Sequence, residues 1–335
     1  MQKMKLAIHL LIFGVLVIFA VSNCGDNPSK DKQDSNTSEK LVSSPSSHFQ
    51  TDSAYHFIQK QIDFGYRIPG TKEHQACAQW LKQTLKGYVD TLYYQNGSAV
   101  APGNITIPVY NIIGSINPKA TKRIMLASHW DSRPWADQDD KDTEKPILGA
   151  NDGASGVGIL MELARMLKSN SLPNDIGIDI FFFDSEDYGK SEVDDSYCLG
   201  SQYWGKNLHV SNYKAHFGVL LDMVGGANAK FMWEGNSNDW GSFALSHIWT
   251  VAQELGYSSY FLTELTGAVI DDHMYVHAAT KIPMIDIIHY NDEVGFAPHW
   301  HTHKDDMTNI DKKTLKAVGH TLENVLFNPP ASIHY

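Results

Sequence analysis

Residues 178–187 read IDIFFFDSED, a mostly apolar run that ends in four polar residues, three of which are acidic. A short apolar run rich in isoleucine and phenylalanine is typical of a buried β-strand. Strands that are buried on both faces occur in parallel sheets that helices cover on each side. This stretch therefore predicts a central sheet in which one strand ends at a polar segment, residues 184–187.

Strands and helices alternate along the rest of the chain. The predicted strands span residues 109–116, 123–128, 179–183, 218–221 and 284–288. The predicted helices span residues 154–168, 243–255 and 312–326, after two helical stretches within residues 51–86. Because apolar strands alternate with amphipathic helices, we expect a single α/β domain with a mostly parallel central sheet flanked by helices. The sequence shows no internal repeat.

Three of these strands end in residues that can bind a metal or move a proton. His129 follows residues 123–128, the segment 184–187 follows the opening strand, and Asp222 follows residues 218–221. The carboxyl ends of strands in an open α/β sheet face one crevice, which is where ligands bind. We therefore expect these side chains to converge.

Asp152 lies in a turn of small residues, 149–156, directly before a predicted helix. Aspartate is one of the preferred residues at a helix N-cap, and this is one interpretation. The neighbouring glycines would also let a ligand or a metal approach the backbone closely. The sequence leaves both interpretations open.

Further candidates lie in loops. Glu186 and Asp187 are adjacent, so one can bind a metal while the other acts as an acid/base group; a solvated loop is the alternative. His301 is in a loop with three histidines, and Asp271 is in an acidic cluster that also suits a helix start. A catalytic zinc site needs three protein ligands and one open position. Two carboxylates and one loop histidine would provide these ligands.

Other functional classes lack support in the sequence. The formal net charge is −11 and the body of the chain has no cluster of Lys and Arg, which argues against a nucleic-acid-binding protein. The sequence has no glycine-rich nucleotide-binding loop, no Walker loop, no GxSxG segment and no HExxH segment.

The N-terminal residues have the pattern of an export signal. Lys3 and Lys5 precede an apolar run, residues 6–21, that is short for a membrane span. Cys24 follows it, as the lipid-attachment cysteine does in bacterial lipoproteins; ordinary cleavage nearby is the alternative. Residues 25–48 are too polar to bury a core. We expect an export signal (1–23), a tether (24–48) and a folded domain (49–335) in a periplasmic or membrane-anchored bacterial protein.

Taken together, residues 51–327 resemble the M28 zinc-peptidase clan. Residues 67–70 (RIPG) are similar to the early RxPG turn of that clan. Its two-zinc aminopeptidases bind metal at five positions, and position 186 matches their general base. The five positions are matched here by His129, Asp152, Asp187, Asp222 and His301.

The chain is more similar to the glutaminyl cyclase branch of this clan, especially its bacterial members. The similar segments are residues 129–135, 149–152, 271–273 and 300–302. The resemblance implies one Zn²⁺ per chain, held by Asp152, Asp187 and His301. It also implies a glutaminyl-peptide cyclotransferase, which converts the N-terminal glutamine of peptides or proteins to pyroglutamate and releases ammonia.

The resemblance also implies roles for other residues. Glu186 would move a proton from the attacking amine to the departing ammonia. Asp222 and Asp271 would lie near it, and these carboxylates would raise one another's pKa. Trp300 and Phe296 would form an apolar wall around the glutamine side chain, with plain core aromatics as the alternative.

The chain departs from the animal cyclases at several positions. Asp187 replaces their glutamate ligand and Ile270 replaces a glutamine. Ser128 and Val157 occupy the places of their disulfide, while the pairing of Cys77 and Cys198 here stays open. Their aromatic residue after the acidic pair has no match in residues 190–195.

Two other functions remain open at this point. An M28 aminopeptidase with two metals would use Glu186 to activate water instead. A surface binding protein with an inactive site would keep these residues without catalysis.

Overall fold

The computed structural model describes residues 47–170 and 172–334. The predicted export signal (1–23) and the predicted tether up to residue 46, including Cys24, lie outside the described residues. At the start of the described chain, the His48 N–H donates to Glu323 Oε1 at 2.7 Å, and Phe49 is buried in the core. The chain is thus part of the folded domain from this point on.

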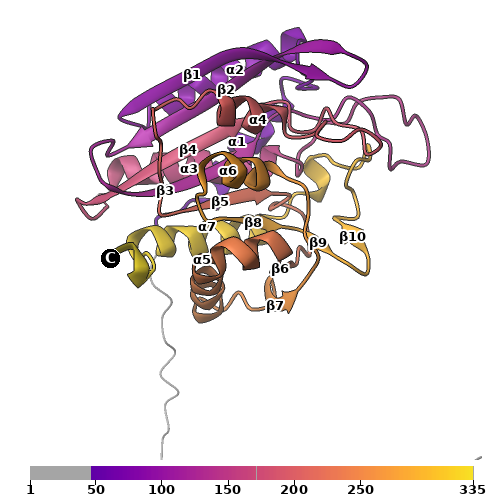
Figure 1. The fold of residues 1–335 in the computed structure, drawn as a ribbon. Helices are drawn as coiled ribbons and strands as arrows, with labels where there is room; N and C mark the ends of the chain where they lie inside the picture. The colour runs from indigo at the N-terminus through magenta and orange to yellow at the C-terminus, as the bar shows by residue number, and fades with distance from the viewer. Residues whose placement is uncertain (1–46, 171, 335) are drawn as a thin grey trace, which may run out of the picture. The chain divides into compact units, whose positions relative to one another are not determined.

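A six-stranded sheet runs through the domain in the order β1-β2-β4-β3-β5-β8. Strands β4, β3, β5 and β8 are parallel, whereas β1 and β2 form an antiparallel hairpin at one edge (Figure 1). The mostly parallel α/β sheet that the sequence predicts is confirmed. The strands are β1 (Thr91–Ala101), β2 (Ile105–Ile116), β3 (Lys122–His129), β4 (Ile176–Phe183), β5 (Phe217–Asp222) and β8 (Met284–Ile288).

Helices cover both faces of this sheet (Figure 1). One face carries α1 (Thr51–Ile62), α2 (Lys72–Lys86), α3 (Ala154–Ser169), α5 (Gly235–Glu254) and α7 (Lys312–Phe327). The other face carries α4 (Leu199–Lys206) and α6 (Asp272–Thr280), which pack against each other. Shorter elements are β6 (Phe231–Trp233), β7 (Phe261–Leu265), β9 (Tyr290–Asn291), β10 (Gly295–Phe296), η1 (Met307–Asn309) and η2 (Ala331–His334).

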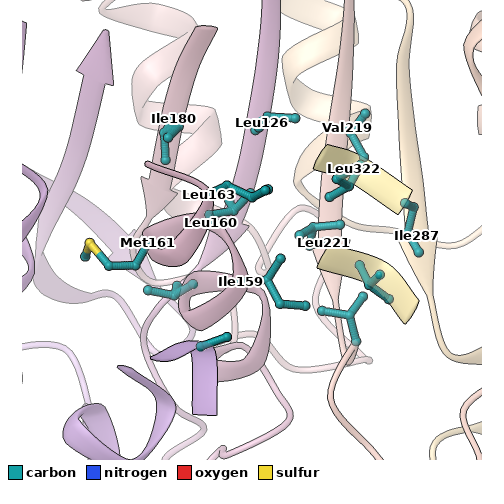
Figure 2. Close-up of a cluster of buried hydrophobic side chains, with 14 of the residues drawn as sticks. Leu126, Ile159, Leu160, Met161, Leu163, Ile180, Val219, Leu221, Ile287 and Leu322 are labelled. Carbon is teal, nitrogen blue, oxygen red and sulfur yellow. The ribbon is translucent and has the colours of Figure 1, made fainter. Parts of the chain in front are cut away.

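The strands divide their side chains between two apolar cores, because successive residues of a strand point to opposite faces. On one face, strand residues such as Leu126 and Val219 meet Leu160 and Leu163 of α3 (Figure 2). On the other face, Phe181 and the other strand residues whose side chains point the same way pack with residues of α4 and α6. This burial on both faces explains why the strands are nearly continuous apolar runs.

The structure differs from the sequence-based predictions in several elements. Helix α5 begins at Gly235, not at residue 243, because the Glu234 carboxylate accepts from the N–H groups of Asn236 and Ser237, and a non-helical residue, Gly241, interrupts the helix. The prediction also missed β1, α4 and the short strands, whereas the helix start that the acidic cluster at Asp271 suits is present, with Asp271 as the N-cap of α6. β1 is a half-exposed edge strand with no buried run, and α4 has only 8 residues.

Cys77 and Cys198 are both buried free thiols. Within the described residues, no helix combines the length and the apolar character that a membrane crossing requires.

Candidate metal and acid-base site

The carboxyl ends of three neighbouring strands form the floor of the site. β3 ends at His129, β5 ends at Asp222, and β4 leads directly into the loop that carries Glu186 and Asp187. These strands are parallel neighbours in the sheet, so their ends lie at one edge. The convergence that the strand-end pattern predicts is therefore present.

A cavity of about 640 Å³ opens at this edge. Its volume falls within the usual range for small-molecule sites. The cavity is lined by eight candidate site residues predicted from the sequence: Asp152, Glu186, Asp187, Asp222, Asp271, Phe296, Trp300 and His301. His129 is not among its lining residues.

Three of these residues form a cluster that fits a metal ion. Asp152, Asp187 and His301 are buried, and each offers a ligand atom within 4.8 Å of the others. His301 Nε2 lies 3.2 Å from Asp187 Oδ1 and 3.8 Å from Asp152 Oδ2. Asp187 Oδ2 is buried without a hydrogen-bond partner among the described residues. Two carboxylates and one imidazole form a donor set that suits zinc and leaves a coordination position open.

The turn before α3 fixes Asp152. The Asp305 carboxylate accepts from the backbone N–H of Asn151 at 2.7 Å and of Asp152 at 3.1 Å. The N-cap of α3 is Gly153, without a side-chain cap, so the N-cap interpretation of Asp152 is wrong. Instead, Asp152 Oδ1 lies 2.9 Å from His129 Nε2. A Cβ at Gly153 would lie 2.4 Å from the His129 ring, which explains why this turn requires glycine.

A second cluster shares Asp152 with the first. His129, Asp152 and Asp222 also offer ligand atoms within 4.8 Å of one another. His129 Nε2 lies 3.3 Å from Asp222 Oδ1, and the Asp131 carboxylate lies 3.4 Å from the other ring nitrogen. The ligand geometry therefore fits either a second cation bound by His129 or, without that cation, a protonated His129.

The loop after β4 is held so that its two acidic residues diverge. The Asp131 carboxylate accepts from the backbone N–H of Glu186 at 3.0 Å and of Asp187 at 3.1 Å. Asp187 faces the metal cluster, while Glu186 groups with Cys198 and Asp271 within 4.8 Å. The Cys198 thiol donates to Glu186 Oε1 at 3.2 Å. The two neighbours thus serve different clusters, as the sequence suggests.

Burial and mutual repulsion shift these carboxylates toward the protonated form. Burial raises the pKa of Glu186 well above its usual value, and the charges of Asp271 and Asp187 add to this. Burial, followed by the charge of Asp152, raises the pKa of Asp222 to about 7. The pKa of Asp271 is raised too, chiefly by burial. A carboxyl group with a raised pKa can hold and release a proton near neutral pH.

An aromatic wall borders the metal cluster. The Trp300 ring stacks on His301 with centroids 3.7 Å apart, and Phe296 lies 4.5 Å from Trp300. Both aromatic side chains are only partly buried and line the cavity, so they are available to a ligand. On the rest of the rim, Tyr197, Met274 and Tyr275 also line the cavity.

Sequence reasoning missed several of these residues. Tyr197 lies just past residues 190–195, where an aromatic residue was expected and not found. Asp286 is fully buried in β8, and a charged residue inside an apolar strand was an available signal. Its Oδ2 lies 3.8 Å from His273 Nδ1, and His273 Nε2 lies 3.3 Å from Glu234 Oε2. These three buried polar residues meet at the first turn of α6, whose N-cap is Asp271.

Comparison with known proteins agrees with this site. A model of peptidase family M28 matches residues 111–326. The chain is 46% identical to Porphyromonas gingivalis glutaminyl cyclase, over 84% of this chain and 99% of that one, with a TM-score of 0.82. It is 45% identical to a Zn-dependent exopeptidase from Parabacteroides distasonis, over 85% and 100% of the two chains, with a TM-score of 0.81. The glutaminyl-peptide cyclotransferase of Boiga irregularis is 26% identical over 77% of this chain and 76% of its own length.

Proposed function

Because the chain belongs to peptidase family M28 and, within it, to the bacterial glutaminyl cyclases, we infer that it converts the N-terminal glutamine of peptides or proteins to pyroglutamate and releases ammonia. One observation carries this beyond the similarity. The three-residue metal cluster and the partly exposed Glu186 side chain line the same cavity, so a bound amide can reach both.

We propose that Asp152, Asp187 and His301 hold one zinc ion per chain. Zinc bound there would act as a Lewis acid on the side-chain carbonyl of the substrate glutamine. The aliphatic part of that glutamine would lie against Trp300 and Phe296, which line the cavity beside His301. This wall would exclude water from one side of the reacting amide.

The bond changes require a proton carrier but no protein nucleophile. The substrate's α-amine nitrogen attacks the carbon of its own side-chain amide, and the bond to the amide nitrogen breaks. One proton must move from the attacking nitrogen to the leaving nitrogen, which departs as ammonia. Glu186 is the carboxylate that we assign to both transfers, because it lines the cavity and its raised pKa suits a group that accepts and returns a proton.

Asp222 and Asp271 would keep the proton of Glu186 available. Both line the cavity, and Asp271 belongs to the same close cluster as Glu186. Repulsion among these buried carboxylates disfavours ionising all of them at once. They therefore share a small number of protons among them, and Glu186 is not locked in its charged form.

A two-metal aminopeptidase is the second candidate, because His129, Asp152 and Asp222 also form a possible cation site. A peptidase would activate water and release the first residue of a peptide. The similarity to a Zn-dependent exopeptidase keeps this candidate open to test. An inactive binding protein has less support, since the complete set of metal-binding and acid/base residues faces one cavity.

We also propose that the protein is exported and held at a membrane by a lipid on Cys24. The pattern of residues 1–24 supports this proposal.

The experiment that tests the function compares two dipeptides with the purified protein, one beginning with glutamine and one with leucine. We expect ammonia from the first and no free leucine from the second, together with one zinc per chain by metal analysis. Two zincs per chain and release of leucine would favour the aminopeptidase.

A further inference from the structure

Arg133 is buried beside the metal cluster. It contacts Asp187, a proposed zinc ligand, and Asp137, four residues further along the chain. Its Nη1 donates to Asp187 Oδ1 at 2.9 Å and to the Asp187 backbone carbonyl at 3.1 Å. The other side of the guanidinium donates twice to Asp137, from Nε to Oδ1 at 2.7 Å and from Nη2 to Oδ2 at 2.8 Å. One planar guanidinium thus binds two carboxylates in fixed directions.

Asp137 in turn contacts His301, another of the proposed zinc ligands. Its Oδ1 lies 3.2 Å from His301 Nδ1, the ring nitrogen opposite the one that faces Asp152 and Asp187. This contact is at ion-pair distance, and His301 Nδ1 is buried with no hydrogen-bond partner among the described residues. A carboxylate that binds one ring nitrogen of a histidine fixes the tautomer and directs the other nitrogen toward a metal, so Asp137 is the carboxylate placed to take this role. Asp137 is partly exposed, with 36% of its side chain accessible, while His301 and Arg133 are buried.

The same contacts determine which oxygen of Asp187 is available. Arg133 donates to Oδ1, the oxygen that also lies 3.2 Å from His301 Nε2, whereas Oδ2 is buried and lacks a hydrogen-bond partner in the described structure. An aspartate has a short side chain with few rotamers, so a partner on one oxygen sets the position of the other. Arg133 therefore fixes Asp187 directly and His301 through Asp137.

We propose that Arg133 and Asp137 are positioning residues that set the zinc affinity of this site by holding Asp187 and His301 in place before the metal binds. This inference rests on the proposed zinc site. It is independent of which reaction the bound zinc supports. Neither Arg133 nor Asp137 is proposed to touch the substrate or the metal.

A matched control pair lies two residues beyond Asp137 and two residues beyond His301. Asp139 Oδ2 lies 3.0 Å from His303 Nδ1, so Asp139 and His303 repeat the carboxylate–imidazole pair of Asp137 and His301. This second pair is outside the metal cluster. Removing the Asp139 carboxylate perturbs the same loop but leaves the contacts of Arg133 and Asp137 with the zinc ligands unchanged.

The test measures the zinc Kd of the full-length protein by competition with a chromophoric chelator. Asp137→Ala should raise the Kd by about 10- to 100-fold, the usual effect of losing such a partner. Asp137→Asn should give a smaller rise, because one oxygen acceptor remains. Arg133→Lys should also weaken binding, since a lysine cannot bridge two carboxylates in this geometry. Asp139→Ala should leave the Kd at the wild-type value.

Thermal unfolding of each metal-free variant separates positioning from folding. Without zinc, Asp137→Ala should unfold at a lower temperature than the wild type, because Arg133 and His301 each lose a carboxylate partner, and a cooperative transition shows that the variant still folds. Added zinc should raise its unfolding temperature by less than it raises that of the wild type, because stabilisation by a ligand follows its affinity. The positioning role of Arg133 and Asp137 is refuted if Asp137→Ala binds zinc as tightly as the wild type does. It is also refuted if Asp139→Ala weakens zinc binding as much as Asp137→Ala does. A wild-type protein that binds no zinc would instead overturn the proposed metal site.

Discussion

The Cys198 thiol donates a hydrogen bond to Glu186 Oε1 across 3.2 Å, inside the cluster in which Cys198 and Asp271 are buried and Glu186 is partly exposed. The backbone supports the same contact, because the Cys198 N–H donates to the Glu186 carbonyl at 2.8 Å. The proposed proton carrier is therefore held by the turn that begins α4 as well as by its own loop.

Replacing Cys198 should test how far this hydrogen bond orients Glu186. A typical hydrogen bond contributes about 1 kcal/mol, so Cys198→Ala should lower kcat by about fivefold. Cys198→Ser keeps a donor of similar size and should recover most of that loss. Steady-state kinetics on a glutamine-initiated dipeptide decide the point; equal losses in both variants would indicate a packing effect alone.

Glu186→Gln should remove the proton carrier while leaving the metal ligands in place. General acid–base catalysis contributes about 10²- to 10⁴-fold, so kcat should fall by at least two orders of magnitude. Metal analysis of the same sample should still find zinc. Near-normal turnover in this variant would refute the role of Glu186.

Phe296→Ala should act on substrate binding more than on the chemical step. Phe296 contacts Trp300 and does not stack on the ligand His301. Loss of an apolar contact of about 1–2 kcal/mol corresponds to a change of about 5- to 30-fold, and we expect this in KM with kcat little changed. A fall in kcat at constant KM would instead indicate a contact made only in the transition state, and unchanged values of both would place Phe296 outside the glutamine site.

The metal-free protein should become less stable as the pH rises from about 6.5 to about 9. Burial lowers the pKa of His301, but the facing carboxylates of Asp187 and Asp137 outweigh it and raise the pKa to about 9. The folded state therefore binds more protons than the unfolded chain in this range, so its stability is lost as the pH passes through the raised pKa.

Thermal unfolding of the metal-free protein across that pH range measures this loss. His301→Asn should weaken the dependence without abolishing it, because its titrating ring is gone while the pKa values of His129 and Asp222 stay raised. Added zinc should stabilise the wild type most at the alkaline end, where the ligands bind a metal without first releasing protons. A stability that rises from pH 6.5 to 9 without zinc would contradict this account.

The fold could be predicted well where a segment is buried on both faces. β4 and the parallel strands beside it are apolar runs that end in polar residues, so both the sheet and the edge that carries the site follow from the sequence. β1 and the start of α5 could not be predicted in the same way. The edge strand has no buried run, and the first turns of α5 depend on the Glu234 carboxylate and on a kink at Gly241.

The site could be predicted only in part, for a physical reason. Residue types at strand ends identify candidate ligands such as Asp187, and the sequence alone left Asp152 between a helix cap and a ligand. Arg133 and Asp137 have no local pattern, because their partners Asp187 and His301 come from distant parts of the chain. Cys198 was missed for the same reason.

The most direct test of the central claim follows the nitrogen atoms of the substrate. The protein is incubated with a glutamine-initiated dipeptide that carries ¹⁵N in the side-chain amide, and the products are analysed by mass spectrometry. Cyclisation of the glutamine should yield labelled ammonia and an unlabelled pyroglutamyl dipeptide in equal amounts. Free glutamine that retains the label, together with the second amino acid, would contradict it.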